Sequence, residues 1–353
     1  MMGTHDTLKQ ARDFIRAQGG KMAPLLVSEE EINPQTQDDL SLQAYALEPT
    51  NTCYQVHYQY PDDAAISEFS FFEDGRQRTV HIGFIKARFG SHEALIPVHY
   101  FIVAAVILRR EQRNLKVWAQ PLIKQGVLVQ KSLVPNQSLL DEFESMGLVI
   151  EDTESEGGDY YELRKRALKK AKSLRLSVED DLIRQWRLSR DAADHFLVVD
   201  GTLMNFRDEQ NIRQCVGVSK SFGSRYFSVS ENNRIMQMEE FQRSWAFQFH
   251  SPEEDIRMGA RERISWYLRL RSRVNSGPEF GLIRVEISRH YRDNASEYAE
   301  RFSRSLLSER LPTSYPAPRW DKHLYPIREC ENYLSSIMPS ISTIAESMKG
   351  VLA

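Results

Sequence analysis

The sequence predicts an α/β fold, in which strands and helices surround a buried sheet. Strand-like runs with alternating apolar residues occupy the first half of the chain, for example at 53–60 and 79–85. One long helical pattern follows at 160–188, and two short apolar runs that end in turns come after it, at 196–199 and 215–220. A chain of 353 residues is long enough for two domains, or for one domain with additions, at about 150 residues per domain.

The N-terminal half is expected to consist of a cap followed by a meander of strands. Residues 1–62 form the expected extension or cap, because a polar segment follows a short helical pattern there. Strands are predicted at 66–72 and 79–85, joined by a turn at Asp74–Gly75, since Asp-Gly is a common hairpin dipeptide. The acidic, glycine-containing segment 151–159 is expected to be a surface loop. Further strands are expected at 116–121 and 126–134.

A single amphipathic helix is predicted at 160–188. This stretch contains neither Gly nor Pro, and its apolar residues recur at spacings of three and four, which is the period of one helix face. The residues on the predicted buried face are Leu163, Ala167, Ala171, Leu174, Val178, Leu182 and Trp186.

The C-terminal part of the chain is predicted to return to strands and then to end in helices. Strands are expected at 244–249, 264–270 and 280–287, and strict alternation in the second predicts one buried and one polar face. Helices are expected after Pro326 and after Pro339. The last helix could contact a partner, although packing on its own domain is the favoured alternative.

Composition excludes several classes of protein. The chain is 41% hydrophobic and 27% charged, which is typical of a globular protein, and its net charge of -3 excludes a uniformly basic nucleic-acid coat. A nucleic acid would therefore have to bind local basic patches. No Gly-x-x-x-x-Gly-Lys-Ser/Thr loop is present, so we do not expect ATP hydrolysis by this chain.

The sequence also indicates a cytoplasmic protein. Three widely separated cysteines form no Cys-x-x-Cys pair, which argues against a disulfide framework or a zinc site. The N-terminus lacks the basic and apolar regions of a secretion signal. The longest apolar run, 94–108, is shorter than the roughly 20 residues that cross a bilayer, so we expect a buried strand or a core helix there.

Three carboxylates and one lysine occupy positions that could carry chemistry. Asp200 follows a short apolar run and would lie at the carboxyl end of a strand, where open α/β sheets bind ligands. Asp74 precedes Gly75 in the same kind of Asp-Gly pair, Glu179 lies at the border of the predicted helix face, and Lys220 follows another apolar strand. Structural alternatives are turns for the aspartates, a surface ion pair with Arg175 for Glu179, and simple solvation for Lys220.

Taken as a set, these residues fit a site for phosphodiester hydrolysis. Two strand-end aspartates and a helix glutamate supply the hard oxygen ligands that Mg²⁺ and Mn²⁺ prefer, and two such ions can activate water and stabilise the leaving oxygen. A nearby lysine could bind the phosphate.

Two concentrations of basic residues could bind a phosphate backbone, with a solvated charged face as the alternative. The first is on the long helix and consists of Arg164, Lys165, Arg166, Lys169, Lys170, Lys172 and Arg175. The second surrounds Trp266 and Tyr267 and consists of Arg257, Arg261, Arg263, Arg269, Arg271 and Arg273.

The order of these motifs resembles the NurA nuclease family, whose members partner the HerA hexameric DNA translocase. The match covers roughly 66–335, and its most specific part is the second Asp-Gly block together with the Val-Gly-Val-Ser-Lys block. The matching blocks are 72–76 (FEDGR), Arg175 with Glu179, 198–203 (VVDGTL), 216–221 (VGVSKS) and 323–331 (HLYPIRECE).

The resemblance implies roles for particular residues. Carried over by position, Asp74, Glu179 and Asp200 would bind the metal, and Lys220 would stand near the phosphate. The chain departs from the family in the last block, where the family's Tyr falls on His323 and its His falls on Glu331. Glu331 can still ligate a metal, and His323 can still move a proton. DNA contacts are expected from Arg76, Trp266, Tyr267, Arg269 and Arg271.

The resemblance also implies a fold and an activity. It implies an RNase H-like core with a mixed sheet over 63–338 and an insertion at about 94–158. The helix that the apolar pattern predicts after Pro339 then forms a separate C-terminal segment at 339–353. The insertion follows from the long interval between Asp74 and the helix glutamate, which leaves Glu162 as an alternative to Glu179.

The implied protein is a homodimeric, Mn²⁺- or Mg²⁺-dependent DNA nuclease that works with a HerA-like translocase in DNA end processing or in defence against phage. One alternative is a degenerate DNA-binding or regulatory subunit of such a complex. The other is an unrelated α/β protein whose Asp-Gly turns match by chance.

Overall fold

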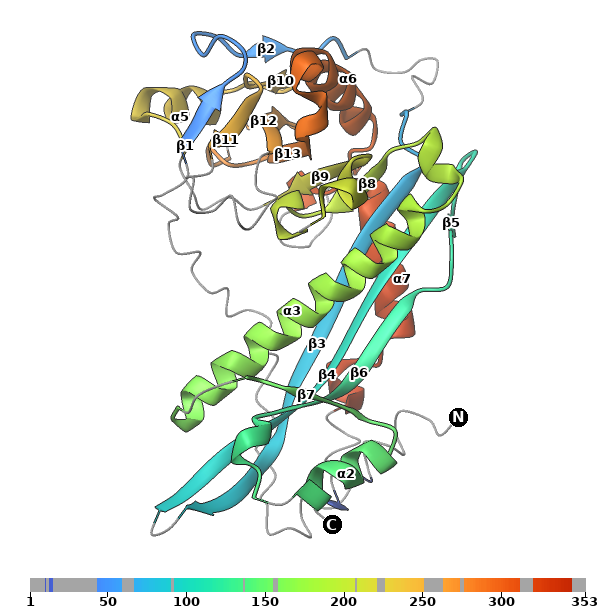
Figure 1. The fold of residues 1–353 in the computed structure, drawn as a ribbon. Helices are drawn as coiled ribbons and strands as arrows, with labels where there is room; N and C mark the ends of the chain where they lie inside the picture. The colour runs from blue at the N-terminus through green and yellow to red at the C-terminus, as the bar shows by residue number, and fades with distance from the viewer. Residues whose placement is uncertain are drawn as a thin grey trace.

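The fold is a large mixed sheet flanked by helices, which confirms the α/β prediction (Figure 1). The computed structural model describes residues 10, 13–14, 43–58, 67–89, 92–135, 137–154, 158–206, 208–220, 226–250, 263–273, 276–311 and 320–344. Within these ranges, a single sheet of 13 strands contains both parallel and antiparallel pairs.

The centre of the sheet is built around one long hairpin. Strands β3 (Phe71–Phe89) and β4 (His92–Glu111) pair in antiparallel fashion along almost their whole length, and β6 (Leu122–Val129) pairs antiparallel with β4. On the other side of β3, the short strands β8 (Leu197–Asp200) and β9 (Cys215–Ser219) run parallel to it. Of the two short apolar strands predicted from the sequence, β8 therefore lies next to the strand that carries Asp74, and β9 lies next to β8.

The remaining strands extend this sheet in both directions. The N-terminal strands pair with strands from the C-terminal half, so residues 43–58 contribute edge strands to the common sheet. Residues 92–152 likewise supply strands to it. These strands are β1 (Gln43–Ala46), β2 (Tyr54–Gln55), β5 (Asn114–Val117), β7 (Val149–Asp152), β10 (Gln242–Arg243), β11 (Phe247–His250), β12 (Arg263–Arg269) and β13 (Leu282–Ser288).

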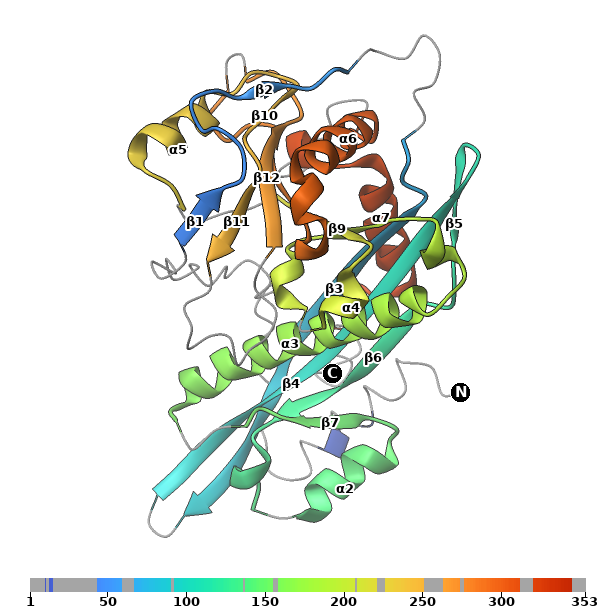
Figure 2. The same ribbon diagram turned by 45° about the horizontal axis from the view of Figure 1, so that its top comes forward.

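Two helices cover opposite faces of the central strands (Figure 2). Helix α3 (Tyr160–Arg187) agrees with the predicted helix to within one residue and packs on the face that includes Phe71. Helix α7 (Tyr325–Ile337), predicted from Pro326, packs on the face that includes Phe72.

In the described part of the chain, no helix has the length and hydrophobicity needed to cross a lipid bilayer. The other helices are α2 (Gln137–Ser145), α4 (Glu209–Ile212), α5 (Val229–Met236) and α6 (Ala295–Ser308), with short 3-10 turns at Lys131–Leu133, Asp191–Ala193, Leu203–Asn205, Arg289–Asn294 and Trp320–Lys322.

The predicted turn at Asp74–Gly75 is wrong. Strand β3 runs through this position without interruption, and Asp74 and Gly75 pair with Val106 and Ala105 of β4. The hairpin instead closes beyond Phe89. A glycine within a strand often marks a close approach by another group, and here the group is the Glu179 carboxylate described below.

The predicted polar face of β12 is also wrong, because all seven residues of this strand are buried. Its second face, which includes Tyr267, is covered by a separate apolar cluster containing Ile235, Met238 and Trp245.

The structure also decides two other predictions. The apolar run at 94–108 is a strand, and the expected loop at 151–159 begins within strand β7. Most of the predicted C-terminal helix lies outside the described residues.

Candidate metal centre

The pairing of β3 with β8 places two aspartates side by side. Phe71, Phe72 and Glu73 pair in parallel with Leu197, Val198 and Val199, so the next residue on each strand is an aspartate. Asp74 continues along β3, whereas Asp200 ends β8. Residues that are neighbours in register point to the same face of a sheet. Both carboxylates therefore belong to the face covered by α7.

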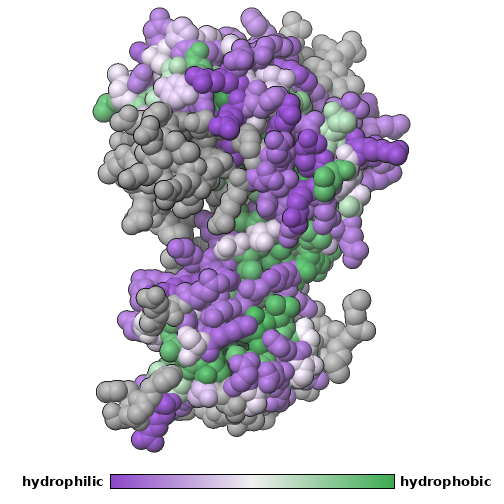
Figure 3. Space-filling view, in the orientation of Figure 1, coloured by the Kyte–Doolittle hydropathy of each residue, from purple (hydrophilic) through white to green (hydrophobic). Residues whose placement is uncertain are grey.

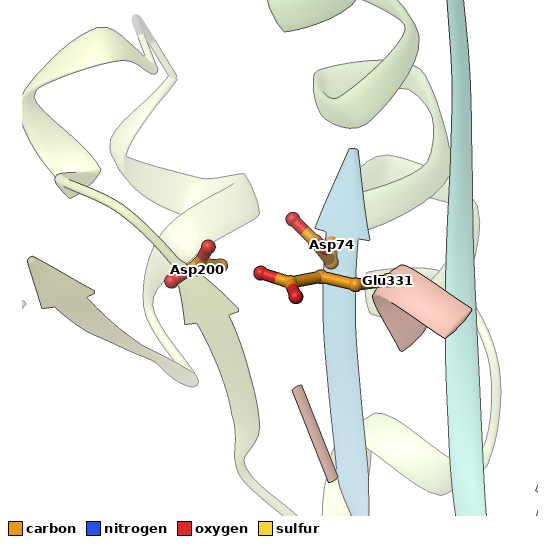
Figure 4. A group of neighbouring side chains, drawn as sticks. All are labelled: Asp74, Asp200 and Glu331. Atoms are coloured by element: carbon orange, nitrogen blue, oxygen red, sulfur yellow. The ribbon is translucent and has the colours of Figure 1, made fainter. Parts of the chain in front are cut away.

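A third carboxylate reaches this position from α7. Glu331 lies in the second turn of the helix, and one oxygen each of Asp74, Asp200 and Glu331 lies within 4.8 Å of the others. Figure 4 shows the three side chains directed toward a common point between β3, β8 and α7. Three carboxylate oxygens at this separation could hold a divalent cation with hard-ligand preference, such as Mg²⁺ or Mn²⁺.

Basic side chains surround the three carboxylates but leave them only partly neutralised. Lys220 Nζ lies 2.9 Å from Asp200 Oδ1 and 3.7 Å from Glu331 Oε1. Arg328 Nη1 lies 2.6 Å from Glu331 Oε2. Lys220 is buried rather than solvated, with a side chain that is 7% exposed. Burial alone would lower the pKa of Lys220, but the charges of Asp200 and Glu331 reverse this effect and raise it, so the ammonium group stays charged.

The crowding of carboxylates changes proton affinity in the centre. Burial raises the pKa of Asp74 well above its usual value, the charge of Asp200 adds to this effect, and Lys220 opposes it. His323 also lies near Glu331, with its Nδ1 3.8 Å from Glu331 Oε1. Burial, helped by the charge of Lys220, lowers the pKa of His323 to about 4. The imidazole is therefore neutral at neutral pH.

Glu179 approaches from the other face of β3. A Cβ atom added to Gly75 would lie 1.9 Å from Glu179 Oε1, so the carboxylate occupies the space that this glycine leaves open. The expected ion pair with Arg175 is present, but it is buried rather than a weak surface pair, because the Glu179 side chain is only 3% exposed. Among the described residues, the group of three converging carboxylates does not include Glu179.

Glu179 nevertheless shares the electrostatic field of the centre. Burial raises its pKa to about 7 against the opposing charge of Arg175, and Asp200 contributes to the increase. The alternative, Glu162, is exposed on the outer surface of α3 and pairs with Lys165. The structure therefore places Glu179, and not Glu162, across β3 from the aspartates.

A fifth acid of this region, the buried Glu73, was not predicted from the sequence. Alternation along β3 directs it toward α3, opposite Asp74. It is fully buried, and neither carboxylate oxygen has a hydrogen-bond partner among the described residues. Burial raises the pKa of Glu73 well above its usual value, and the charges of Glu179 and Asp74 add to the increase. In the sequence it falls between the predicted strand at 66–72 and the predicted turn at Asp74–Gly75, so no pattern indicated its burial.

The turn after Asp200 is held by Glu286, which the sequence analysis also missed. Glu286 Oε2 accepts hydrogen bonds from Thr202 Oγ1 at 2.7 Å and from the Leu203 amide at 2.8 Å. Its other oxygen accepts from Arg284 Nε at 3.0 Å. Glu286 is fully buried on β13, so these contacts fix the chain immediately after Asp200.

The predicted DNA contacts on β12 need correction. Trp266 is fully buried and Tyr267 is nearly so, hence neither ring is available to stack on a base. Arg269 is also buried, and it donates to the carbonyl oxygens of Phe280 and Met236.

The other two predicted DNA contacts differ from each other. Arg271 donates to the Leu311 carbonyl oxygen, and its guanidinium carbon lies 5.1 Å from the centre of the Trp320 ring. Arg76 is half-buried, two positions beyond Asp74 on β3. Alternation places it on the same face as Asp74.

Comparison with known proteins adds no family to this description. No protein-family model matches the chain, and no curated protein matches its sequence.

The close approach of Glu179 to Gly75 predicts the effect of adding a methyl group there. We expect Gly75→Ala to displace the Glu179 carboxylate or β3, at a cost of about 1–3 kcal/mol in the free energy of unfolding. Chemical denaturation would measure this change. Gly277→Ala is the matched control, because an added Cβ there meets no atom within 4 Å. Equal stability of the two variants would contradict the proposed close approach.

The anchoring of the Asp200 turn predicts an effect on metal affinity. Glu286→Gln removes the charge that holds Arg284 and weakens the contacts to Thr202 and Leu203. We expect weaker Mn²⁺ binding by about 10–100-fold, as is usual when an outer partner of a metal ligand is lost. Isothermal titration calorimetry would measure the affinity, with Glu297→Gln on the exposed surface as the control. Unchanged affinity in Glu286→Gln would show that the turn does not depend on this contact.

The raised carboxyl pKa values predict how pH and metal affect stability. A carboxyl group whose pKa is raised by folding binds its proton more tightly in the folded state. The metal-free protein should therefore lose stability as pH rises from 4.5, the ordinary pKa of a glutamate, through about 7, the pKa of Glu179 in the folded protein. A cation replaces these protons, so Mn²⁺ should raise the Tm more at about pH 8 than at about pH 5.5. Differential scanning fluorimetry with chelator or with Mn²⁺ would test this, and equal shifts at both pH values would contradict it.

Proposed function

We propose that this protein is a metal-dependent DNA nuclease of NurA type that hydrolyses phosphodiester bonds by a two-metal mechanism. The observation that carries the proposal is the convergence of Asp74, Asp200 and Glu331, from two strands and a helix that are far apart in the sequence. Carboxylates that repel one another in a largely buried position are costly unless a cation compensates them. A metal centre is therefore a better explanation than the Asp-Gly turns considered as the structural alternative.

The donor set fits the ion that this proposal requires. Asp74, Asp200 and Glu331 offer only carboxylate oxygens, which suit Mn²⁺ and Mg²⁺ better than softer metals. When bound, such ions would lower the pKa of a coordinated water and stabilise negative charge on the phosphate oxygens. Glu179 would bind the second ion. To do so, Glu179 would give up its ion pair with Arg175.

The neighbouring residues would bind the substrate and handle protons. Lys220 is charged and lies next to Asp200, so it can attract a phosphate oxygen to the centre. Neutral His323 can accept a proton at Nδ1, which has no hydrogen-bond partner among the described residues. Arg328 holds Glu331 Oε2 and so orients the carboxylate that replaces the family's histidine.

The proposed family also suggests a wider setting. A mixed sheet with carboxylates on β3 and at the end of β8 supports an RNase H-like core. The sequence resemblance supports a homodimer in the cytoplasm that works with a HerA-like hexameric ATPase, in DNA end processing or defence against phage. A separate motor is needed because the chain has no P-loop of its own.

Loss of the Asp200 carboxylate is the direct test of this function. We expect Asp200→Asn, and likewise Asp200→Ala, to lower Mn²⁺-dependent DNA cleavage by more than about 100-fold, because loss of a metal ligand should exceed the effect of losing an outer partner. The asparagine variant keeps the shape of the side chain and relieves its repulsion with Asp74, so the fold should persist. Cleavage of labelled single-stranded and duplex DNA would be followed on gels, with and without Mn²⁺.

Asp194→Asn is the matched control, since Asp194 is exposed just before β8 and should leave cleavage unchanged. If Asp200→Asn cleaves DNA as fast as the parent, the assignment of the site is wrong. If the parent itself binds DNA but gives no metal-dependent products, with or without a translocase, the protein is instead a binding or regulatory subunit.

A further inference from the structure

Only one of the two basic concentrations in the sequence lies on the described surface as a continuous feature. On β12, Arg263 and Arg269 are fully buried, while Arg257 and Arg261 lie outside the described residues. On α3, by contrast, Lys165, Lys169 and Lys172 are all exposed. We call these three residues the lysine stripe. Figure 3 shows hydrophilic side chains over the first half of this helix.

The lysine stripe lies on the outer side of α3. The first half of the helix is packed through Leu163, Ala167, Ala171 and Leu174, which are buried on the sheet. With 3.6 residues per turn, positions 165, 169 and 172 fall on a different side from these four. The three ammonium groups therefore form one row along the helix surface.

The charge of the lysine stripe is hardly compensated. Lys169 and Lys172 make no ion pair with any described residue, and Lys165 Nζ lies 3.2 Å from Glu162 in an exposed pair. Exposed pairs of this kind are weak. Glu162 is also the only acidic residue of the sequence between Tyr160 and Arg175. A net acidic protein thus carries a concentrated positive row on the first half of α3.

The lysine stripe is in helical register with Glu179. Position 179 is seven residues beyond Lys172, which is two turns, so it lies on the same side of the helix. At Lys172 this side is exposed, whereas at Glu179 it is buried beneath Gly75. The stripe therefore leads along α3 toward Glu179, which lies across β3 from the three converging carboxylates and about 21 Å along the helix from Lys165 at 1.5 Å per residue.

We propose that the sugar-phosphate backbone of a DNA strand lies along the lysine stripe and is led by it along α3 toward Glu179. This inference rests on the proposed nuclease function and adds to it the path by which the substrate approaches. Lysine ammonium groups bind phosphates as hydrated point charges, without reading the bases. The stripe would therefore contribute affinity and salt dependence, but no sequence preference.

The test is DNA binding in the absence of metal, which separates the lysine stripe from catalysis. Fluorescence anisotropy with a labelled single strand in chelator would compare the parent with the triple variant K165Q/K169Q/K172Q over a range of salt concentrations. Loss of three phosphate contacts should reduce the slope of log K against log salt by about 2. Binding at about 0.1 M salt should then be roughly 100-fold weaker, with the two proteins converging near 1 M.

Two control variants separate position from charge. K165R/K169R/K172R keeps the positive charges and should bind like the parent. R113Q/K116Q/R190Q removes three exposed basic residues far from the stripe and should keep the parental salt slope. A normal slope in K165Q/K169Q/K172Q, or an equal loss in R113Q/K116Q/R190Q, would overturn the proposal.

The outcomes also distinguish this inference from the proposed function. If the parent cleaves DNA and K165Q/K169Q/K172Q binds and cleaves normally, the nuclease assignment stands and the lysine stripe is not the path. If binding depends on the stripe but the parent gives no metal-dependent cleavage, the path stands and the nuclease assignment falls.

Discussion

The concentration of carboxylates where β8 ends beside β3 is the constraint on which the rest of the centre depends. Asp74, Asp200 and Glu331 converge on one face, while Glu73 and Glu179 lie against the other. Taking ionised carboxylates out of water is costly, and their mutual repulsion increases the cost. Lys220, Arg328 and Arg175 offset only part of it. The remaining negative charge must therefore be neutralised by a bound cation or by protons.

The sheet makes this arrangement possible because it separates the acids onto two faces. Alternation along β3 sends Glu73 toward α3 and Asp74 toward α7, so neighbouring residues contribute to opposite sides of one strand. The apolar packing of Phe71 under α3 and of Phe72 under α7 holds both helices in place. Gly75 then removes the side chain that would otherwise keep Glu179 away. The cost of crowding is therefore met by large apolar contacts on both faces, in addition to the local ion pairs.

Periodicity in the sequence predicted the elements that depend on local pattern. The long helix was found this way, whereas the two short strands before Asp200 and Lys220 were found as compact apolar runs, and both residues were singled out because they follow such a run. The turn at Asp74–Gly75 was wrong because the same dipeptide suits a hairpin and a close contact within a long strand. Glu73 and Glu286 were missed because a buried acid looks like a surface acid until its tertiary contacts are known. Glu331 was identified only through the resemblance.

The contrast between arginine and lysine explains why net charge says little about what this protein binds. Arg269 and Arg284 are buried because a guanidinium group can satisfy several acceptors at once, such as carbonyl oxygens or Glu286. The more strongly hydrated ammonium groups of Lys169 and Lys172 remain in water. A basic run that includes large aromatic residues was therefore a poor guide to a surface, because the same aromatic residues favour burial. A basic run on one side of a helix is a better guide, since packing of the opposite side leaves it exposed.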